Sequence, residues 1–216
     1  MLRATIVGLG LLTLRQGDLP RALPQLERAM SLCHEVTLPA LFPWVAAALG
    51  AAYTLDGRVA DAVPLLTQAM EQTIAMEMVV EQAVCCLPLG EAHMLAGCLG
   101  EAHTLAEQTL VFARAHQERG NEAYALRLLG EIAAHRAPPD VAQAAAHYRQ
   151  ALALAEELGM RPLQAHCHRG LGTLYAKTGR QKQARAELSI AIEMYRPMDM
   201  TFWLPQAEAA LAQIGG

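Results

Sequence analysis

The run His166-Cys167-His168 is the one cluster of metal-ligand residue types that stands out in the sequence. Histidine and cysteine bind zinc, but a site forms only where the side chains converge on one point. Residues two apart on a helix point to different faces, so we expect no shared metal ion there. The five cysteines are odd in number and include no Cys-x-x-Cys pair. This usage predicts reduced thiols and a cytoplasmic setting.

Motifs that mark enzymes are missing from the sequence. It contains no phosphate-binding Gly-x-x-x-x-Gly-Lys loop, no His-Glu-x-x-His zinc helix and no Gly-x-Ser-x-Gly turn for a nucleophilic serine. Gly8-Leu9-Gly10 lacks the later glycine of a dinucleotide-binding fingerprint. We therefore predict that the chain is not an enzyme and needs no cofactor.

Charge and hydropathy argue against two classes of partner. The chain has a net charge of −4 and no dense basic run, so we expect no nucleic acid partner. Its longest apolar run, residues 41–53, is too short to span a bilayer, so we expect no membrane association. A hydrophobic content of 53%, dominated by alanine and leucine, predicts a buried core built from helices.

The elements that position the polar side chains follow from an internal repeat. A Leu-Gly pair returns at spacings of 40, 40, 40 and 42 residues. The pairs are Leu9-Gly10, Leu49-Gly50, Leu89-Gly90, Leu129-Gly130 and Leu171-Gly172. We call the glycine of each pair the anchor glycine. Repeats of this length are typical of stacked helical hairpins, because one hairpin cannot bury its apolar face alone.

Other positions keep the same register. Seven residues after the anchor glycine, four of the five units have a second glycine, which is expected to end the first helix. Small residues twelve and nineteen positions after the anchor allow the two helices of a unit to approach closely. In the fourth unit these positions come two residues late, and the insertion lies around Pro138-Pro139-Asp140.

This pattern resembles the tetratricopeptide repeat (TPR), with its Leu-Gly, aromatic, Gly and two Ala positions. The period of 40 residues is longer than the usual 34, and the proline that commonly closes the second helix is missing. The resemblance implies an all-α fold, a right-handed α-α superhelix of five helix pairs plus a C-terminal capping helix. Repeats of this length are similar to the C-terminal regions of large bacterial signalling ATPases, namely maltose-activator-like regulators and ATPases fused to nucleotide cyclases.

The repeat predicts a single TPR-like solenoid over residues 1–216. The expected units are 3–40, 41–80, 81–120, 121–160 and 161–200, with the capping helix at 201–214. The first unit begins without a cap. We therefore expect a fragment of a longer chain or an end that a partner covers, and the alternative is a gene that simply starts there.

In such repeats the first helices line a concave groove. Positions six and three before the anchor glycine, and one, four and five after it, form one helical stripe. The candidate partner-binding residues on this stripe are Trp44, Val84, Leu87, Glu91, Tyr124, Arg127, Glu131, His135, His166, Arg169 and Lys177. The stripe is mostly apolar in the first three units and polar with a basic bias in the last two. Arg127, Arg169 and Lys177 are expected to hold a carboxylate or another acidic group.

Three functions fit this reading. The leading hypothesis is a protein-interaction or regulatory scaffold that is part of a larger bacterial signalling protein and binds a protein or peptide in the groove. A sensor that binds a small ligand or peptide inside the superhelix would need an enclosed pocket with convergent polar groups. A self-assembling structural unit would use the apolar stripe to form a homodimer.

Overall fold

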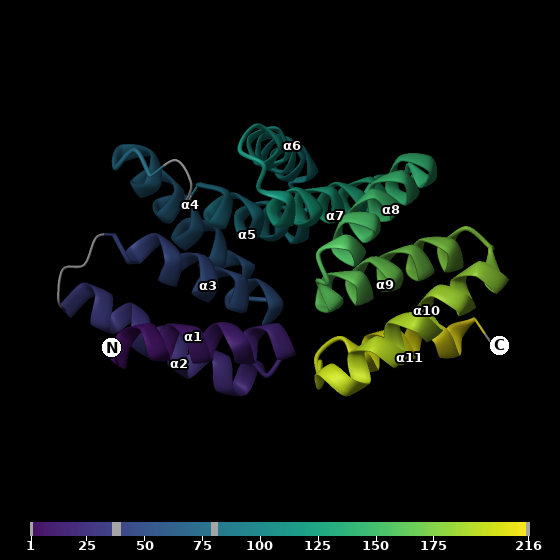
Figure 1. Ribbon diagram of the computed structural model, residues 1–216, viewed down its shortest axis with the longest axis horizontal. Coiled ribbons are helices and arrows are strands. Elements are labelled where there is room, and N and C mark those ends of the chain that lie inside the picture. Colours follow the sequence, from purple (N-terminus) through teal and green to yellow (C-terminus); the bar gives the residue numbers. More distant parts are fainter. Residues whose placement is uncertain (1, 36–39, 79–81, 215–216) are drawn as a thin grey trace. The chain divides into compact units, whose positions relative to one another are not determined.

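The computed structural model describes residues 2–35, 40–78 and 82–214, and every long element in this part of the chain is an α-helix. The first helix of each pair is α1 (Leu2–Gln16), α3 (Phe42–Leu55), α5 (Gln82–Leu95), α7 (Arg119–His135) or α9 (Arg161–Lys177). The second helices are α2 (Leu19–Glu35), α4 (Val59–Ala75), α6 (Leu99–Ala115), α8 (Val141–Glu157) and α10 (Gln181–Tyr195). A short turn, η1 (Arg196–Met198), and a last helix, α11 (Leu204–Gln213), follow. The expected all-α fold of five helix pairs and a C-terminal helix is confirmed (Figure 1).

The helices fall into two compact units, residues 1–109 and 110–216, and α6 contributes to both. In unit 1, α1 packs on α2, α3 on α4, and α5 on both α3 and α4. In unit 2, consecutive helices from α7 to α11 pack on one another, and α7 also contacts α9. That all five helix pairs form one solenoid stays a prediction. Within the described residues, none of the helices has the length and apolar content to cross a membrane.

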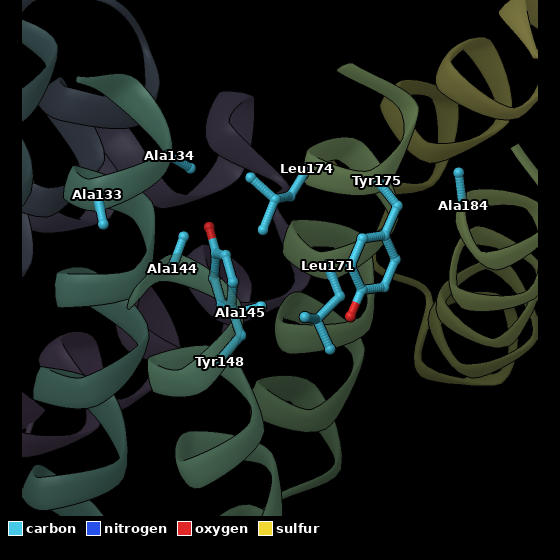
Figure 2. Close-up of a cluster of buried hydrophobic side chains, with 9 residues drawn as sticks. All are labelled: Ala133, Ala134, Ala144, Ala145, Tyr148, Leu171, Leu174, Tyr175 and Ala184. Carbon is cyan, nitrogen blue, oxygen red and sulfur yellow. The ribbon is translucent and has the colours of Figure 1, made fainter. Parts of the chain in front are cut away.

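Each second helix buries one narrow stripe. In α4 the buried residues are Ala62, Leu66, Ala69 and Thr73, a spacing of three or four residues that returns to the same face. In unit 2 the stripe of α8 carries Tyr148, whose ring lies between the helices that carry Ala133 and Leu171 (Figure 2). Alanine elsewhere on these stripes lets the helices come close, so one large side chain fills the space between them.

The closest approach occurs at the anchor glycine. A methyl group added at Gly172 would lie 2.6 Å from Cγ of Leu188 and 3.1 Å from its backbone nitrogen. The same relation holds at Gly10, where the added carbon would lie 2.7 Å from Cδ2 of Leu26, and at Gly50, which faces Leu66. In each case the facing leucine comes sixteen residues after the glycine. The anchor is therefore glycine because the second helix occupies the space of a side chain.

Two turns per unit reverse the chain. The expected glycines at the end of the first helices, such as Gly57 and Gly179, have positive φ angles of 80° and 74°. The turn to the next unit also contains a residue with positive φ. It lies twenty-seven positions after the anchor glycine, except in the fourth unit, where the two-residue insertion moves it to position twenty-nine. These residues are Glu77, Gln117, Gly159 and Asp199. Both kinds of turn contain a backbone hydrogen bond to the carbonyl five residues earlier. In the turn within the fifth unit Arg180 N donates to Tyr175 O (2.9 Å), and in the turn after the fourth unit Met160 N donates to Ala155 O (2.8 Å).

The fourth unit departs from the others as expected. Its first helix is followed by a longer loop, residues 136–140, where the insertion was predicted. Asp140 begins α8, since its side chain accepts a hydrogen bond from Gln143 N at 3.0 Å.

We expect Gly172→Ala to lower the free energy of unfolding by about 1–3 kcal/mol, because the added methyl group would overlap the side chain and approach the backbone of Leu188. Gly120→Ala in α7 is the matched control, since its nearest neighbour would lie 4.0 Å away. The control is expected to be neutral or to stabilise by up to about 1 kcal/mol through helix propensity. Urea unfolding of both variants checks this, and equal effects would contradict it.

At the turns between units, Gln117→Gly is expected to stabilise unit 2 by about 1 kcal/mol, because glycine adopts a positive φ without steric cost. Gly159→Ala is expected to cost about as much, although nothing lies within 4 Å of the added carbon. Thermal unfolding measures both. Shifts of the same sign would show that backbone conformation does not decide stability at these turns.

Candidate functional site

The predicted stripe residues of unit 1 lie on α3 and α5. Trp44 is 42% exposed, although it is a large apolar side chain. Val84, Leu87 and Glu91 on α5 are half-buried. Unit 1 therefore presents an exposed indole and two partly accessible aliphatic side chains on first helices.

In unit 2 the predicted residues divide into a buried group and an exposed group. Arg127, Glu131, His166 and Arg169 are buried or half-buried. Tyr124 is half-buried on α7. His135 and Lys177, at the C-terminal ends of α7 and α9, are exposed. That Lys177 acts together with Arg127 and Arg169 on one acidic group stays a prediction.

A charged cluster joins α7 to α9. Nη1 of Arg127 lies 2.6 Å from Oε1 of Glu131, one helical turn further along α7. Nη2 of Arg169 lies 4.0 Å from the same carboxylate oxygen, and its Nη1 donates to Oε1 of Gln206 on α11 at 2.8 Å. Glu131 thus neutralises Arg127 directly, whereas Arg169 is held by an amide and a distant carboxylate. We call Arg127, Glu131, Arg169 and His166 the cationic cluster.

His166, the fourth member of this cluster, lies among aromatic rings. Its Nδ1 lies 2.8 Å from the hydroxyl oxygen of Tyr195, and its ring meets that of Trp203 edge to face at a centroid distance of 4.8 Å. Burial lowers the pKa of His166 well below its usual value, and the charges of Arg127 and Arg169 lower it further. The imidazole is therefore neutral at physiological pH and adds no charge to the site.

Buried phenol and thiol groups next to the cluster stay protonated. Burial raises the pKa of Tyr148 well above its usual value and also raises that of Tyr195. Burial raises the pKa of the Cys167 thiol to about 12. A thiol with such a pKa forms almost no thiolate at neutral pH, and the thiolate is the nucleophile and metal ligand.

The two histidines of the run 166–168 turn to different partners. His166 meets Tyr195, whereas Nδ1 of His168 lies 2.6 Å from Oε2 of Glu187 on α10. Among the described residues no group of three or more His, Cys, Asp or Glu side chains is placed to hold a metal ion.

Three side chains of this site were missed by the sequence reasoning, namely Tyr195, Trp203 and Gln206. Gln206 lies six residues before Ala212, the residue that occupies the anchor position in α11. Extending the stripe to the last helix would therefore have found it. Tyr195 and Trp203 lie at the end of α10 and in the turn after it, off the repeat stripe, so the pattern gave no signal for them.

The cluster has the composition of an anion-binding site. Two guanidinium groups face one carboxylate, the neighbouring imidazole is neutral, and a quarter of the Arg169 side chain is exposed. Guanidinium groups bind carboxylates with two parallel hydrogen bonds, and more strongly where water is partly excluded.

Comparison with known proteins identifies the fold and no more. No protein-family model matches the sequence, and no curated protein matches it. Among solved structures, a Rap protein in complex with competence and sporulation factor is similar to 95% of this chain, with 15% identity and a TM-score of 0.77. The match covers 60% of the Rap chain, so the present chain spans about three fifths of its length.

Two further structures agree. The apo form of RapI matches 92% of this chain and 72% of its own, with 14% identity and a TM-score of 0.65. A Podosopora anserina kinesin light chain with nearly identical TPR-like repeats matches 88% of this chain and 93% of its own, with 21% identity and a TM-score of 0.59. The chain therefore has a TPR-like helical-repeat fold, as its sequence predicted.

The lowered pKa of His166 makes stability depend on pH. An unfolded histidine takes up a proton below about pH 6.5, whereas the folded His166 resists it. The unfolded chain then binds more protons, so the free energy of unfolding falls as the pH drops below 6.5. His166→Gln should reduce the dependence of the free energy of unfolding on pH below 6.5. The control His135→Gln, at the exposed end of α7, should leave this dependence unchanged. Urea unfolding from pH 7.5 to pH 5 checks the prediction, and an unchanged slope in His166→Gln would contradict it.

Proposed function

We propose that this chain is a non-catalytic module that binds a protein or peptide along the first helices of its repeats. The cationic cluster of unit 2 holds an acidic group of the ligand. The observation that carries this proposal is the environment of Arg169, whose Nη2 lies 4.0 Å from Oε1 of Glu131 and whose Nη1 is held by the neutral amide of Gln206.

Arg169 is the residue that makes the contact. Its side chain is 25% exposed, against 10% for Arg127, and no carboxylate lies within hydrogen-bonding distance of it in the described residues. A ligand carboxylate that displaces Gln206 from Nη1 exchanges a neutral acceptor for a charged one, and charge-assisted hydrogen bonds are about twice as strong. Arg127 and Glu131 hold the surrounding geometry.

Unit 1 offers an apolar surface of its own for a ligand. Trp44 is exposed on α3, and tryptophan is among the residues that contribute most to binding energy at protein interfaces. Val84 and Leu87 are partly accessible on α5. An apolar side chain of a protein or peptide ligand would remove these groups from water.

The wider setting rests on the sequence resemblance. The forty-residue repeats of this chain are similar to those of bacterial signalling ATPases. We therefore place the module in a cytoplasmic signalling protein of this kind. The Rap protein that shares the fold was solved with competence and sporulation factor bound, which supports ligand binding by this architecture.

A pair of peptide arrays tests the proposal. One array carries random ten-residue peptides with free carboxylates, and the other carries the same peptides with Asn, Gln and a C-terminal amide in place of every carboxyl group. We expect the chain to bind members of the first array. Arg169→Gln should weaken binding of the best peptides about tenfold, the loss of about 1.4 kcal/mol.

Arg161→Gln is the matched control, because Arg161 is an exposed arginine at the start of the same helix. It removes the same charge and is expected to leave affinity within about twofold. Equal binding to both arrays, or the same loss in both variants, would contradict a role for the cationic cluster.

A further inference from the structure

A groove of about 430 Å³ runs between α10 and α11, away from the cationic cluster. Its floor and walls include Arg185, Ser189 and Ile192 of α10 and Glu208, Leu211 and Ala212 of α11. Ile192 is buried, Leu211 is half-buried and Ala212 is exposed. The groove thus has an apolar centre with charged residues along its edges.

The repeat itself shows what kind of element fits this surface. Leu211-Ala212 stands forty residues after Leu171-Gly172, so α11 repeats the register of α9. The corresponding face of α9 is covered by α10. There Leu188 lies against Gly172, and Glu187, the residue before it, bonds His168 at 2.6 Å. The face of α11 that lines the groove is therefore shaped to receive a helix.

Two residue changes set the chemistry of that helix. Ala212 replaces Gly172, and its methyl group occupies space that Leu188 fills one unit earlier. A helix on α11 must consequently present a small residue there. Glu208 replaces His168, so the carboxylate now lies on the receiving helix and the arriving helix must supply the cation.

Glu208 is available for such an exchange. It pairs with Arg196 at 2.9 Å, but the two side chains are 46% and 61% exposed. Exposed pairs of this kind contribute little to stability, so a better placed cation can replace Arg196.

We propose that the groove between α10 and α11 binds an amphipathic helix of a partner protein. This helix places an alanine or glycine against Ala212 and, directly before it in sequence, a lysine or arginine against Glu208. The site is distinct from the cationic cluster and does not depend on its function.

The probe is based on α10, the helix that covers the corresponding face of α9. It is a fluorescein-labelled peptide with the sequence of α10, residues 181–195, carrying Glu187→Lys and Leu188→Ala. The unchanged α10 peptide is the control, because its Glu187 would face Glu208. By fluorescence anisotropy we expect the changed peptide to bind the full chain at least tenfold more tightly than the control. Equal affinities would overturn the proposal.

Variants of the chain locate the contact. Glu208→Lys should weaken the changed peptide at least tenfold and strengthen a peptide that carries only Leu188→Ala. Glu156→Lys, an exposed glutamate of α8 outside the groove, is the matched control and should leave both affinities unchanged. Ala212→Trp should abolish binding by filling the groove, and it tests the site even if Glu208→Lys fails to fold. Persistent binding to Ala212→Trp would overturn the assignment.

A second copy of the chain is the competing occupant. Light scattering over a range of concentrations decides it. A stable dimer of the unchanged chain that Ala212→Trp disrupts would replace the partner helix by self-association and overturn the proposal. A monomer, or a dimer that Ala212→Trp leaves intact, agrees with a groove that is open to a partner.

Discussion

The close contact between an anchor glycine and a large side chain of the next helix organises the first, second, fourth and fifth repeats. In the third repeat, Ala106 stands sixteen residues after Gly90. Leu26, Leu66 and Leu188 come sixteen residues after their glycines and occupy the space that a side chain would fill. The rest of the second helix is then lined with alanine, because the helices are already close. This steric requirement limits the anchor position to glycine and sets how closely the two helices of such a unit approach.

The fourth unit shows how the same contact builds the cationic cluster. Tyr148 replaces the leucine, and its ring lies against two glycines, Gly130 of α7 and Gly170 of α9. The tyrosine thereby packs α7 and α9 against a common side chain (Figure 2). Arg127 and Arg169 lie three residues before the anchor glycines Gly130 and Gly172, and both approach the carboxylate of Glu131. The functional arrangement is a consequence of helix packing and not of a special loop.

The sequence predicted whatever depends on the repeat register and missed whatever lies outside it. The helix pairs and the glycine turns, such as that at Gly57, followed from a spacing of forty residues. The turns between units were missed because Glu77, Gln117 and Asp199 have positive φ angles. These residue types do not indicate a left-handed conformation as glycine does. The Arg127–Glu131 pair was readable from its spacing of four, but the spacing did not reveal that the pair is buried. The contacts of His166 with Tyr195 and Trp203 could be recognised only from the structure.

A double-mutant cycle on Gly50 and Leu66, measured by urea unfolding, tests whether the anchor glycine makes room for the leucine of the second helix. Leu66→Ala alone should cost about 2–5 kcal/mol, because a fully buried leucine is lost. Gly50→Ala should cost about 1–3 kcal/mol in the original chain but almost nothing once Leu66 is alanine, since the clash is gone. The account predicts a coupling of about 1 kcal/mol or more between the two positions. Additive effects would mean that the glycine does not make room for the leucine and would contradict the account.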